Sequence, residues 1–174
     1  MQSDKSQTDL LMQQIVDFFL ENNISFDDIS EILVNQGPGN FSGLRGSIAI
    51  AKGLSLSKNL RLFGYNTFIW SCARFLNKEN SIYSLLKFRD KYFIKKFDKN
   101  LIDDSKIEEV LVNDILINYE RKFKVITTMG SKFFDAKILK LSNLNIVNLD
   151  YNDLEFLKLN DLLNKDLINP LYLS

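Results

Sequence analysis

The fold is decided by residues 35–58, which read NQGPGNFSGLRGSIAIAKGLSLSK. Directly before them, the apolar run at Ile29–Val34 is typical of a short buried strand. Glycines at positions 37, 39 and 43 then allow backbone angles that other residues resist. The stretch Gly43–Lys58 reads as a helix, and Ser42 is available as its N-terminal cap. A strand, a glycine-rich loop and a helix are therefore expected in direct succession.

The glycine loop is the one sharp motif of the chain, and it permits two interpretations. Its amides and the positive end of the helix dipole could attract an anion such as phosphate. The glycine spacing, however, misses G-x-G-x-x-G by one place, and no Gly-Lys-Ser/Thr follows. We therefore favour a structural turn and keep the phosphate cradle as the alternative. Arg45 opposes the dipole of its helix, so a carboxylate, a phosphate or solvent is expected to face it. The candidate loop residues are Gly37, Pro38, Gly39, Asn40, Phe41, Ser42, Gly43, Leu44 and Arg45.

The helix after the loop is unusually rich in small residues, namely Gly43, Gly46, Ser47, Ala49, Ala51, Gly53, Ser55 and Ser57. A helical glycine costs about 1 kcal/mol relative to alanine, so this density needs a compensating reason. Ser47, Ala51 and Ser55 follow one another at i, i+4 and i+8 and share a face, where small side chains let another backbone approach. Packing on the chain's own sheet is one explanation, and a partner helix is the other.

Helical and extended patterns alternate outward from this region. Thr8–Leu20 carries apolar residues at helical spacing, including Leu11, Ile15 and Phe18. Further strands are expected at 60–65, 81–88, 91–97, 107–112, 124–128 and 145–149, and further helices at 68–76, 114–121, 131–139 and 153–163. This alternation predicts an α/β protein with a mixed sheet. The polar run Asn77–Asn80 is the expected boundary between two domains, 1–78 and 79–174.

The composition excludes several classes of function. The chain has 174 residues, 22 basic and 22 acidic side chains and no histidine. Ser-His-Asp and Cys-His catalysis are therefore impossible within the chain, and neutrality offers no general attraction for nucleic acid or a membrane surface. Cys72 is the single cysteine, so there is no internal disulfide and no zinc cluster. We expect a cytoplasmic protein that holds no catalytic residues, cofactor or metal and has neither a signal peptide nor a membrane span.

The string GPGNFSGLRGSIAIAKGL at 37–54 resembles the signature of the TsaB family, which belongs to the bacterial machinery that makes threonylcarbamoyladenosine in tRNA. The family pattern is G-P-G-S-F-T-G-L-R, followed by a helix that ends in A-K-G-L. Asn40 and Ser42 depart from it, and the remaining loop residues match. Asn169-Pro170-Leu171-Tyr172-Leu173 resembles the family's closing P-[LV]-Y-L-R tail, with Ser174 in place of the arginine.

The resemblance implies an actin-like, ribonuclease-H-like (ASKHA) fold of two subdomains. Family members begin with an aspartate-bearing strand and hairpin, whereas this chain enters a helix almost at once. The resemblance therefore predicts a truncated N-terminal subdomain, with an uncovered strand edge at Ile32–Val34. Such an edge would make the isolated chain self-associate or aggregate unless an upstream segment or a partner covers it.

The resemblance also implies a non-catalytic scaffold or activating subunit that pairs with a TsaD-like catalytic subunit, joined by a TsaE-like ATPase. The chain would meet tRNA only through that complex. The first two helices form the family's pairing surface, which here gives Leu11, Ile15, Phe18, Ser47, Ala51 and Ser55. If so, Ala51→Trp should obstruct pairing and leave the fold intact. The alternatives are a small actin-like nucleotide-binding phosphotransferase and a truncated product without activity of its own.

Overall fold

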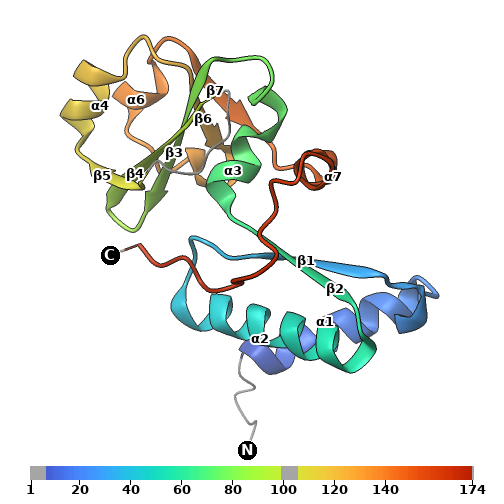
Figure 1. Cartoon of the computed structure of the whole chain (residues 1–174). Coiled ribbons are helices and arrows are strands. Elements are labelled where there is room, and N and C mark those ends of the chain that lie inside the picture. Colours follow the sequence, from blue (N-terminus) through green and yellow to red (C-terminus); the bar gives the residue numbers. More distant parts are fainter. Residues whose placement is uncertain (1–6, 99–105, 174) are drawn as a thin grey trace, which may run out of the picture. The chain divides into compact units, whose positions relative to one another are not determined.

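A computed structural model describes residues 7–98 and 106–173, which divide between two compact units (Figure 1). Unit 1 takes Met1–Asn66 together with Leu163–Ser174, and unit 2 takes Thr67–Leu162. The division differs from the one expected at Asn77–Asn80, because the chain leaves unit 1 directly after a strand. The chain also returns to unit 1 at Leu163. A boundary predicted from a polar stretch of sequence cannot show such a return.

Unit 1 is a layer of two helices on a small parallel sheet. Its elements are α1 (Gln7–Glu21), the 3-10 helix η1 (Phe26–Asp28), β1 (Glu31–Asn35), α2 (Phe41–Lys58) and β2 (Arg61–Tyr65). β1 and β2 pair in parallel, and among the described residues they make a two-stranded sheet. The core joins Val34, Ile48, Ala51 and Ile168. Strands leading into this sheet would fall outside the described residues, so the truncated subdomain stays a prediction.

Unit 2 is a mixed five-stranded sheet with helices on both faces. Its strands are β3 (Ser81–Phe88), β4 (Lys91–Asp98), β5 (Glu108–Val110), β6 (Lys124–Thr127) and β7 (Leu144–Val147), in the order β5-β4-β3-β6-β7. Its helices are α3 (Thr67–Cys72), the 3-10 helix η2 (Ala73–Phe75), α4 (Val112–Asn118), α5 (Thr128–Ser131), α6 (Ala136–Leu139) and α7 (Tyr151–Leu159). Leu85 packs with Ile115 of α4 and Ile138 of α6. On the opposite face, the hydroxyl of Ser84 hydrogen-bonds that of Ser71 in α3 at 2.9 Å. The α/β class with a mixed sheet is confirmed.

Most expected elements are present, with shifted ends. The 81–88 and 91–97 hairpin is confirmed, and Arg89 takes the positive φ of 56° that its tight turn requires. The single helix expected at 131–139 is wrong, since α5 ends at Ser131 and the next helix, α6, begins only at Ala136. Asp135 separates them: its carboxylate accepts the amide of Lys137 at 2.8 Å and caps α6.

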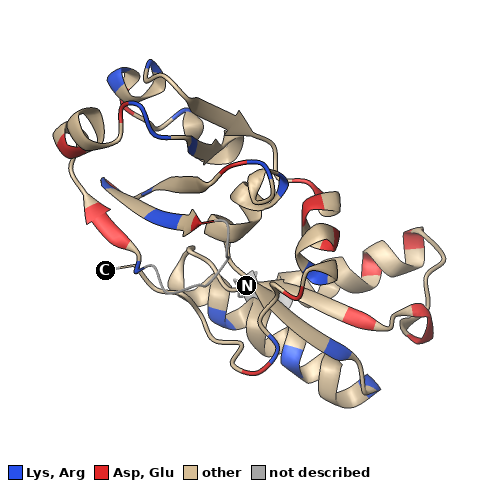
Figure 2. Cartoon of the chain, turned by 45° about the horizontal axis from the view of Figure 1, so that its top comes forward, with Lys and Arg blue, Asp and Glu red and all other residues tan. Residues whose placement is uncertain are grey.

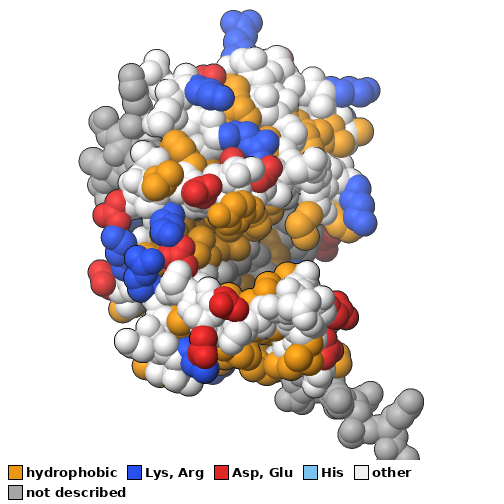
Figure 3. Space-filling view, turned by 90° about the vertical axis from the view of Figure 1, so that its right-hand side faces the viewer, with side chains coloured by type: hydrophobic (Ala, Val, Ile, Leu, Met, Phe, Trp, Pro, Cys, Tyr) orange, Lys and Arg blue, Asp and Glu red, His pale blue; other side chains and the backbone are white. Residues whose placement is uncertain are grey.

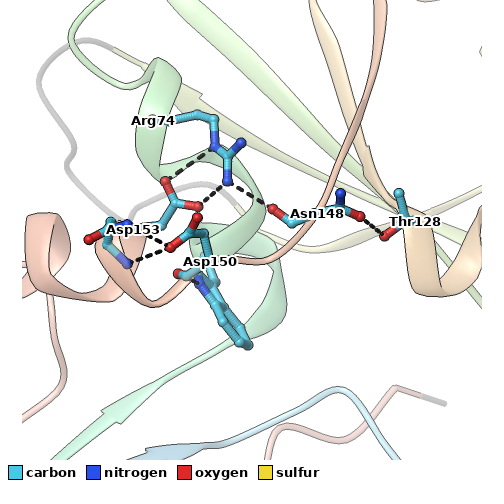
Figure 4. A network of polar contacts seen from close by, with 7 residues as sticks. Arg74, Thr128, Asn148, Asp150 and Asp153 are labelled. Carbon is cyan, nitrogen blue, oxygen red and sulfur yellow. Dashed lines mark hydrogen bonds and ion pairs between the residues drawn. The ribbon is translucent and has the colours of Figure 1, made fainter.

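An arginine anchors the last helix of unit 2 (Figure 4). Arg74 donates to both carboxylate oxygens of Asp153, at 3.2 and 2.5 Å, and to the carbonyl oxygen of Asn148 at 2.8 Å. The Asp153 carboxylate raises the pKa of Arg74. The indole of Trp70 donates to the carbonyl oxygen of Asp150, the residue that caps α7. These bonds fix α7 against η2.

Cys72 is fully buried, and burial raises the pKa of its thiol to about 12. Its expected role as a small core residue is confirmed, because a thiol with that pKa is inert at neutral pH. Among residues 7–98 and 106–173, no helix is both long and apolar enough to cross a membrane. Within the same ranges, His, Cys, Asp and Glu side chains form no group of three that could hold a metal ion.

Lys124 is a fully buried cation on strand β6, which lies between β3 and β7. Its ammonium has three N–H donors and lies within hydrogen-bond distance of four carbonyl oxygens, those of Tyr119 at 2.5 Å, Lys122 at 2.6 Å, Glu120 at 2.8 Å and Ser142 at 3.0 Å. Burial lowers its pKa to about 8, so the side chain still carries its proton at pH 7. The Lys124 ammonium thus links the loop after α4 to the loop before β7.

We expect Lys124→Met to lower the free energy of unfolding by about 3 kcal/mol, because it removes a buried cation and leaves the carbonyl oxygens around it without their donor. Urea titration of the variant, followed by far-UV circular dichroism, measures the change. Lys140→Met is the matched control, because Lys140 is exposed. Equal unfolding midpoints for the two variants would show that the four carbonyls do not need the ammonium.

Candidate functional site

The glycine loop is shaped by a backbone that only glycine adopts without strain. Gly37 has a φ of +116°, and a Cβ there would lie 2.9 Å from the carbonyl oxygen of Leu171 and 3.0 Å from Leu44. A Cβ at Gly39 would also approach Leu44, at 3.3 Å. Leu44 is buried, so its side chain fills the space beneath the loop.

The helix after the loop is capped by Asn40, and the expectation that Ser42 is the cap is wrong. α2 begins at Phe41, and the side-chain oxygen of Asn40 accepts the amide of Gly43 at 2.6 Å. A Cβ at Gly43 would meet that same oxygen, which explains the glycine. Asn caps a helix as well as Ser does. Asn40 itself has an extended backbone, so the helix starts directly after it, at Phe41.

Three amides of the loop region are engaged within the chain, those of Gly37, Gly43 and Leu44. Gly37 donates its amide to the side-chain oxygen of Asn35 at 2.8 Å, and Gly43 donates to Asn40. The amide of Leu44 closes the first helical turn on the carbonyl of Asn40. Amides that already have partners offer little to a phosphate, so this geometry favours the structural turn over the cradle.

The end of the chain returns to the loop through Gln36, a buried residue that the sequence reasoning missed. Its side-chain amide donates to the carbonyl oxygens of Asn169 at 2.8 Å and Leu167 at 3.4 Å. Its backbone carbonyl accepts the amide of Leu171 at 2.6 Å. A Cβ at Gly64 of β2 would lie 2.4 Å from the side-chain oxygen of Gln36, so this glycine makes room for the amide. The NPLYL tail at 169–173 is thus hydrogen-bonded to the start of the loop.

An aromatic stack lies on the outside of the loop. The rings of Phe41 and Tyr172 stack with centroids 5.1 Å apart, and the Arg45 guanidinium lies 5.0 Å from the Phe41 centroid. Phe41 is 57% exposed and Tyr172 49% exposed. Of the partners weighed for Arg45, solvent fits, because the residue is exposed, and its guanidinium also faces an aromatic ring of its own loop.

The small-residue face of α2 points largely inward. Ala51 is buried in the core of unit 1, because Leu44, Ile48 and Ala51 follow one another at the spacing of the face that packs on β1. Ser47 and Ser55 are half-buried, and their hydroxyls donate to the carbonyl oxygens of Leu44 and Leu60. The expectation that Ala51→Trp leaves the fold intact is therefore wrong, since the indole would have to enter the core.

The exposed face of α2 carries other residues, Ala49, Lys52, Gly53 and Leu56. Leu56 is 85% exposed, and a Cβ built at Gly53 meets nothing within 4 Å. On α1, which contacts α2, Leu11 and Ile15 are half-buried and Phe18 is exposed. Exposed hydrophobic side chains also appear in the space-filling view (Figure 3), and acidic and basic residues are interspersed along the described chain (Figure 2).

We expect Gln36→Leu to destabilise the chain by about 1–3 kcal/mol, because the carbonyl oxygens of Leu167 and Asn169 lose the donor that the buried Gln36 side chain supplies. Hydrogen exchange should show lost protection at residues 164–171. The exposed Gln14→Leu serves as the control. Unchanged protection in Gln36→Leu would mean that the tail is held by other contacts.

A comparison with known protein families matches the N-terminal part of the chain, which contains the glycine loop. The family model described as TsaD, tRNA N6-adenosine threonylcarbamoyltransferase, matches residues 3–83. Three curated proteins named tRNA threonylcarbamoyladenosine biosynthesis protein TsaB match parts of the chain. The protein of Buchnera aphidicola subsp. Baizongia pistaciae is 40% identical over 50 residues, that of subsp. Schizaphis graminum 35% over 63, and that of Escherichia coli K12 32% over 63. In the same order, the matched residues make up 29%, 36% and 36% of this chain. They make up 23%, 30% and 27% of the three relatives, so this chain spans less than a third of the length of each relative.

Solved structures extend the likeness to nearly the whole chain. A Pseudomonas aeruginosa protein with similarity to peptidase YEAZ superposes with a TM-score of 0.59 at 14% identity, covering 97% of this chain and 84% of that one. YeaZ from P. aeruginosa gives a TM-score of 0.58 at 13% identity, covering 94% and 83%. At these identities the likeness establishes the fold. The chain therefore has the fold of YeaZ and resembles TsaB proteins in sequence.

Proposed function

We propose that this chain is a non-catalytic scaffold or activating subunit of the complex that installs threonylcarbamoyl on adenosine in tRNA. It would pair with a TsaD-like catalytic subunit, with a TsaE-like ATPase as a further partner, and would meet tRNA through the complex. The observation that carries the proposal is the 32–40% identity to TsaB proteins, supported by the YeaZ fold. The finer assignment of that fold as actin-like, with two ribonuclease-H-like subdomains, is part of the same proposal.

The engaged loop supports a subunit without phosphate chemistry of its own. Amides of the loop are bonded to Asn35 and Asn40, and the sequence holds no histidine to act as a general base. These observations count against the phosphotransferase alternative, because a phosphate site in an actin-like fold needs free donors at such a loop.

We place the pairing surface on the outward face of α2, around Ala49, Gly53 and Leu56, with the exposed Phe18 of α1 as a further contact. This proposal replaces the inward residue Ala51 and keeps the two helices. A glycine inside a helix costs about 1 kcal/mol relative to alanine, and the open space around Gly53 shows that packing within the chain does not demand it. A closely approaching partner backbone supplies the missing reason.

We expect Gly53→Trp to fold normally and to weaken binding to a TsaD-like protein from the same genome by at least about tenfold, because the indole occupies the space of the partner backbone. Gly53→Ala is the matched control: it stays small, should retain pairing and should stabilise α2 by up to about 1 kcal/mol. Co-purification and calorimetric titration measure both. If the two variants pair with equal affinity, the pairing surface lies elsewhere.

We also expect the purified chain alone neither to hydrolyse ATP nor to modify tRNA, and to raise threonylcarbamoyl transfer when added to its partners. Radiolabelled threonine incorporation into tRNA measures the second effect, and phosphate release measures the first. ATP turnover by the isolated chain that disappears in Arg45→Ala would instead support the phosphotransferase.

A further inference from the structure

Unit 2 carries a basic cavity of about 230 Å³ at one end of its sheet, where β3, β4 and β5 lie beside α4 (Figure 1). Among the described residues, three lysines line it, Lys96, Lys106 and Lys122, against one carboxylate, that of Glu108. The three lysines and Glu108 are exposed. In a chain whose net charge is zero, this local excess of positive charge makes the cavity attractive to anions.

Two tyrosine rings form the other wall of the cavity. Tyr83 and Tyr119 meet edge to face with centroids 5.2 Å apart, and both are half-buried. The ammonium of Lys122 lies 5.2 Å from the Tyr83 ring centroid and 5.3 Å from that of Tyr119. Basic groups and aromatic rings therefore converge on one point.

The fold holds these groups in place. Tyr83 and Lys96 are direct partners in the β3–β4 pair, so their side chains point to the same face of the sheet. Tyr119 and Lys122 belong to the loop whose carbonyls surround the buried ammonium of Lys124. The loop is therefore fixed from below, and the cavity is a preformed feature of unit 2.

A second cavity, of about 670 Å³, adjoins the first, because Tyr83 and Lys122 line both. Its other described lining residues are mostly polar, and among them are Arg121, Asn80, Asn143 and the acidic Glu79. The pair of cavities thus offers an aromatic subsite, a shared lysine and a polar subsite.

We propose that these two cavities bind a short segment of single-stranded nucleic acid. One base stacks on the Tyr83 ring in the first cavity, Lys122 binds the phosphate that follows, and the next nucleotide lies in the second cavity. Stacking on aromatic rings combined with a basic track is how proteins bind single strands without reading their sequence. The two joined cavities favour a strand over a free nucleotide, which would fill the first cavity alone.

This inference does not rest on the proposed function, because it uses none of the residues of the glycine loop, α1 or α2. Binding by the isolated chain tests it without any partner protein. A failure here therefore leaves the TsaB-like role standing, and a failure of pairing leaves this site standing.

The test is fluorescence anisotropy of the full chain with a fluorescein-labelled oligoadenylate of about 12 nucleotides. We expect affinity to fall as salt rises from about 50 to about 200 mM, and Lys96→Gln/Lys122→Gln to reduce the magnitude of the slope of log K against log salt by about 1.4. Lys137→Gln/Lys140→Gln removes the same charge from exposed positions outside both cavities and should leave binding unchanged.

The aromatic wall has its own test. Tyr83→Leu should weaken binding about tenfold, whereas Tyr83→Phe, which keeps the ring, should bind as the original chain does. No binding by the original chain, equal loss in the two lysine pairs, or equal binding by Tyr83→Leu and Tyr83→Phe would overturn the proposal. Displacement of the strand by AMP at equal nucleotide concentration would overturn the strand assignment in favour of a mononucleotide site.

Discussion

Position 37 has no room for a side chain, and the architecture of unit 1 follows from that constraint. The carbonyl oxygen of Leu171 would lie only 2.9 Å from a Cβ at this position, so the end of the chain can run directly against the loop because residue 37 is glycine. Gln36 then reaches the carbonyls of the returning segment, and Gly64 leaves space for its amide. The loop, the Gln36 side chain and the returning segment therefore hold one another in place, which is why a small two-stranded sheet can carry an ordered loop.

The sequence predicted what depends on near neighbours. The strand, the loop, the following helix and the β3–β4 hairpin come from local periodicity and turn chemistry, and the structure contains them all. It could not predict that Gln36 contacts residues more than 120 positions away, because nothing in the local pattern marks a buried amide. The choice of Asn40 over Ser42 was also out of reach, since both are good caps and the loop backbone decides between them.

The small residues of α2 show where pattern reasoning fails at the site itself. A stripe of small side chains is expected both where a helix packs on its own sheet and where it meets a partner. Ala51 serves the first purpose and Gly53 has no internal neighbour, although both lie in the same run of sequence. Sequence alone locates the helix, and only the positions of β1 and β2 separate its inner face from its outer one.

The return of residues 163–173 has a consequence for biosynthesis. Unit 2 is continuous in sequence, whereas unit 1 is built from two segments with the whole of unit 2 between them. During translation, unit 2 has all of its residues before the returning segment is synthesised, because domains emerge in chain order. Gln36 and Gly64 acquire their partners in that segment only afterwards, and for Gly64 the partner is Asn164. The N-terminal helices are therefore made first but completed last, and a nascent chain stalled before residue 163 would present unit 1 with its core open.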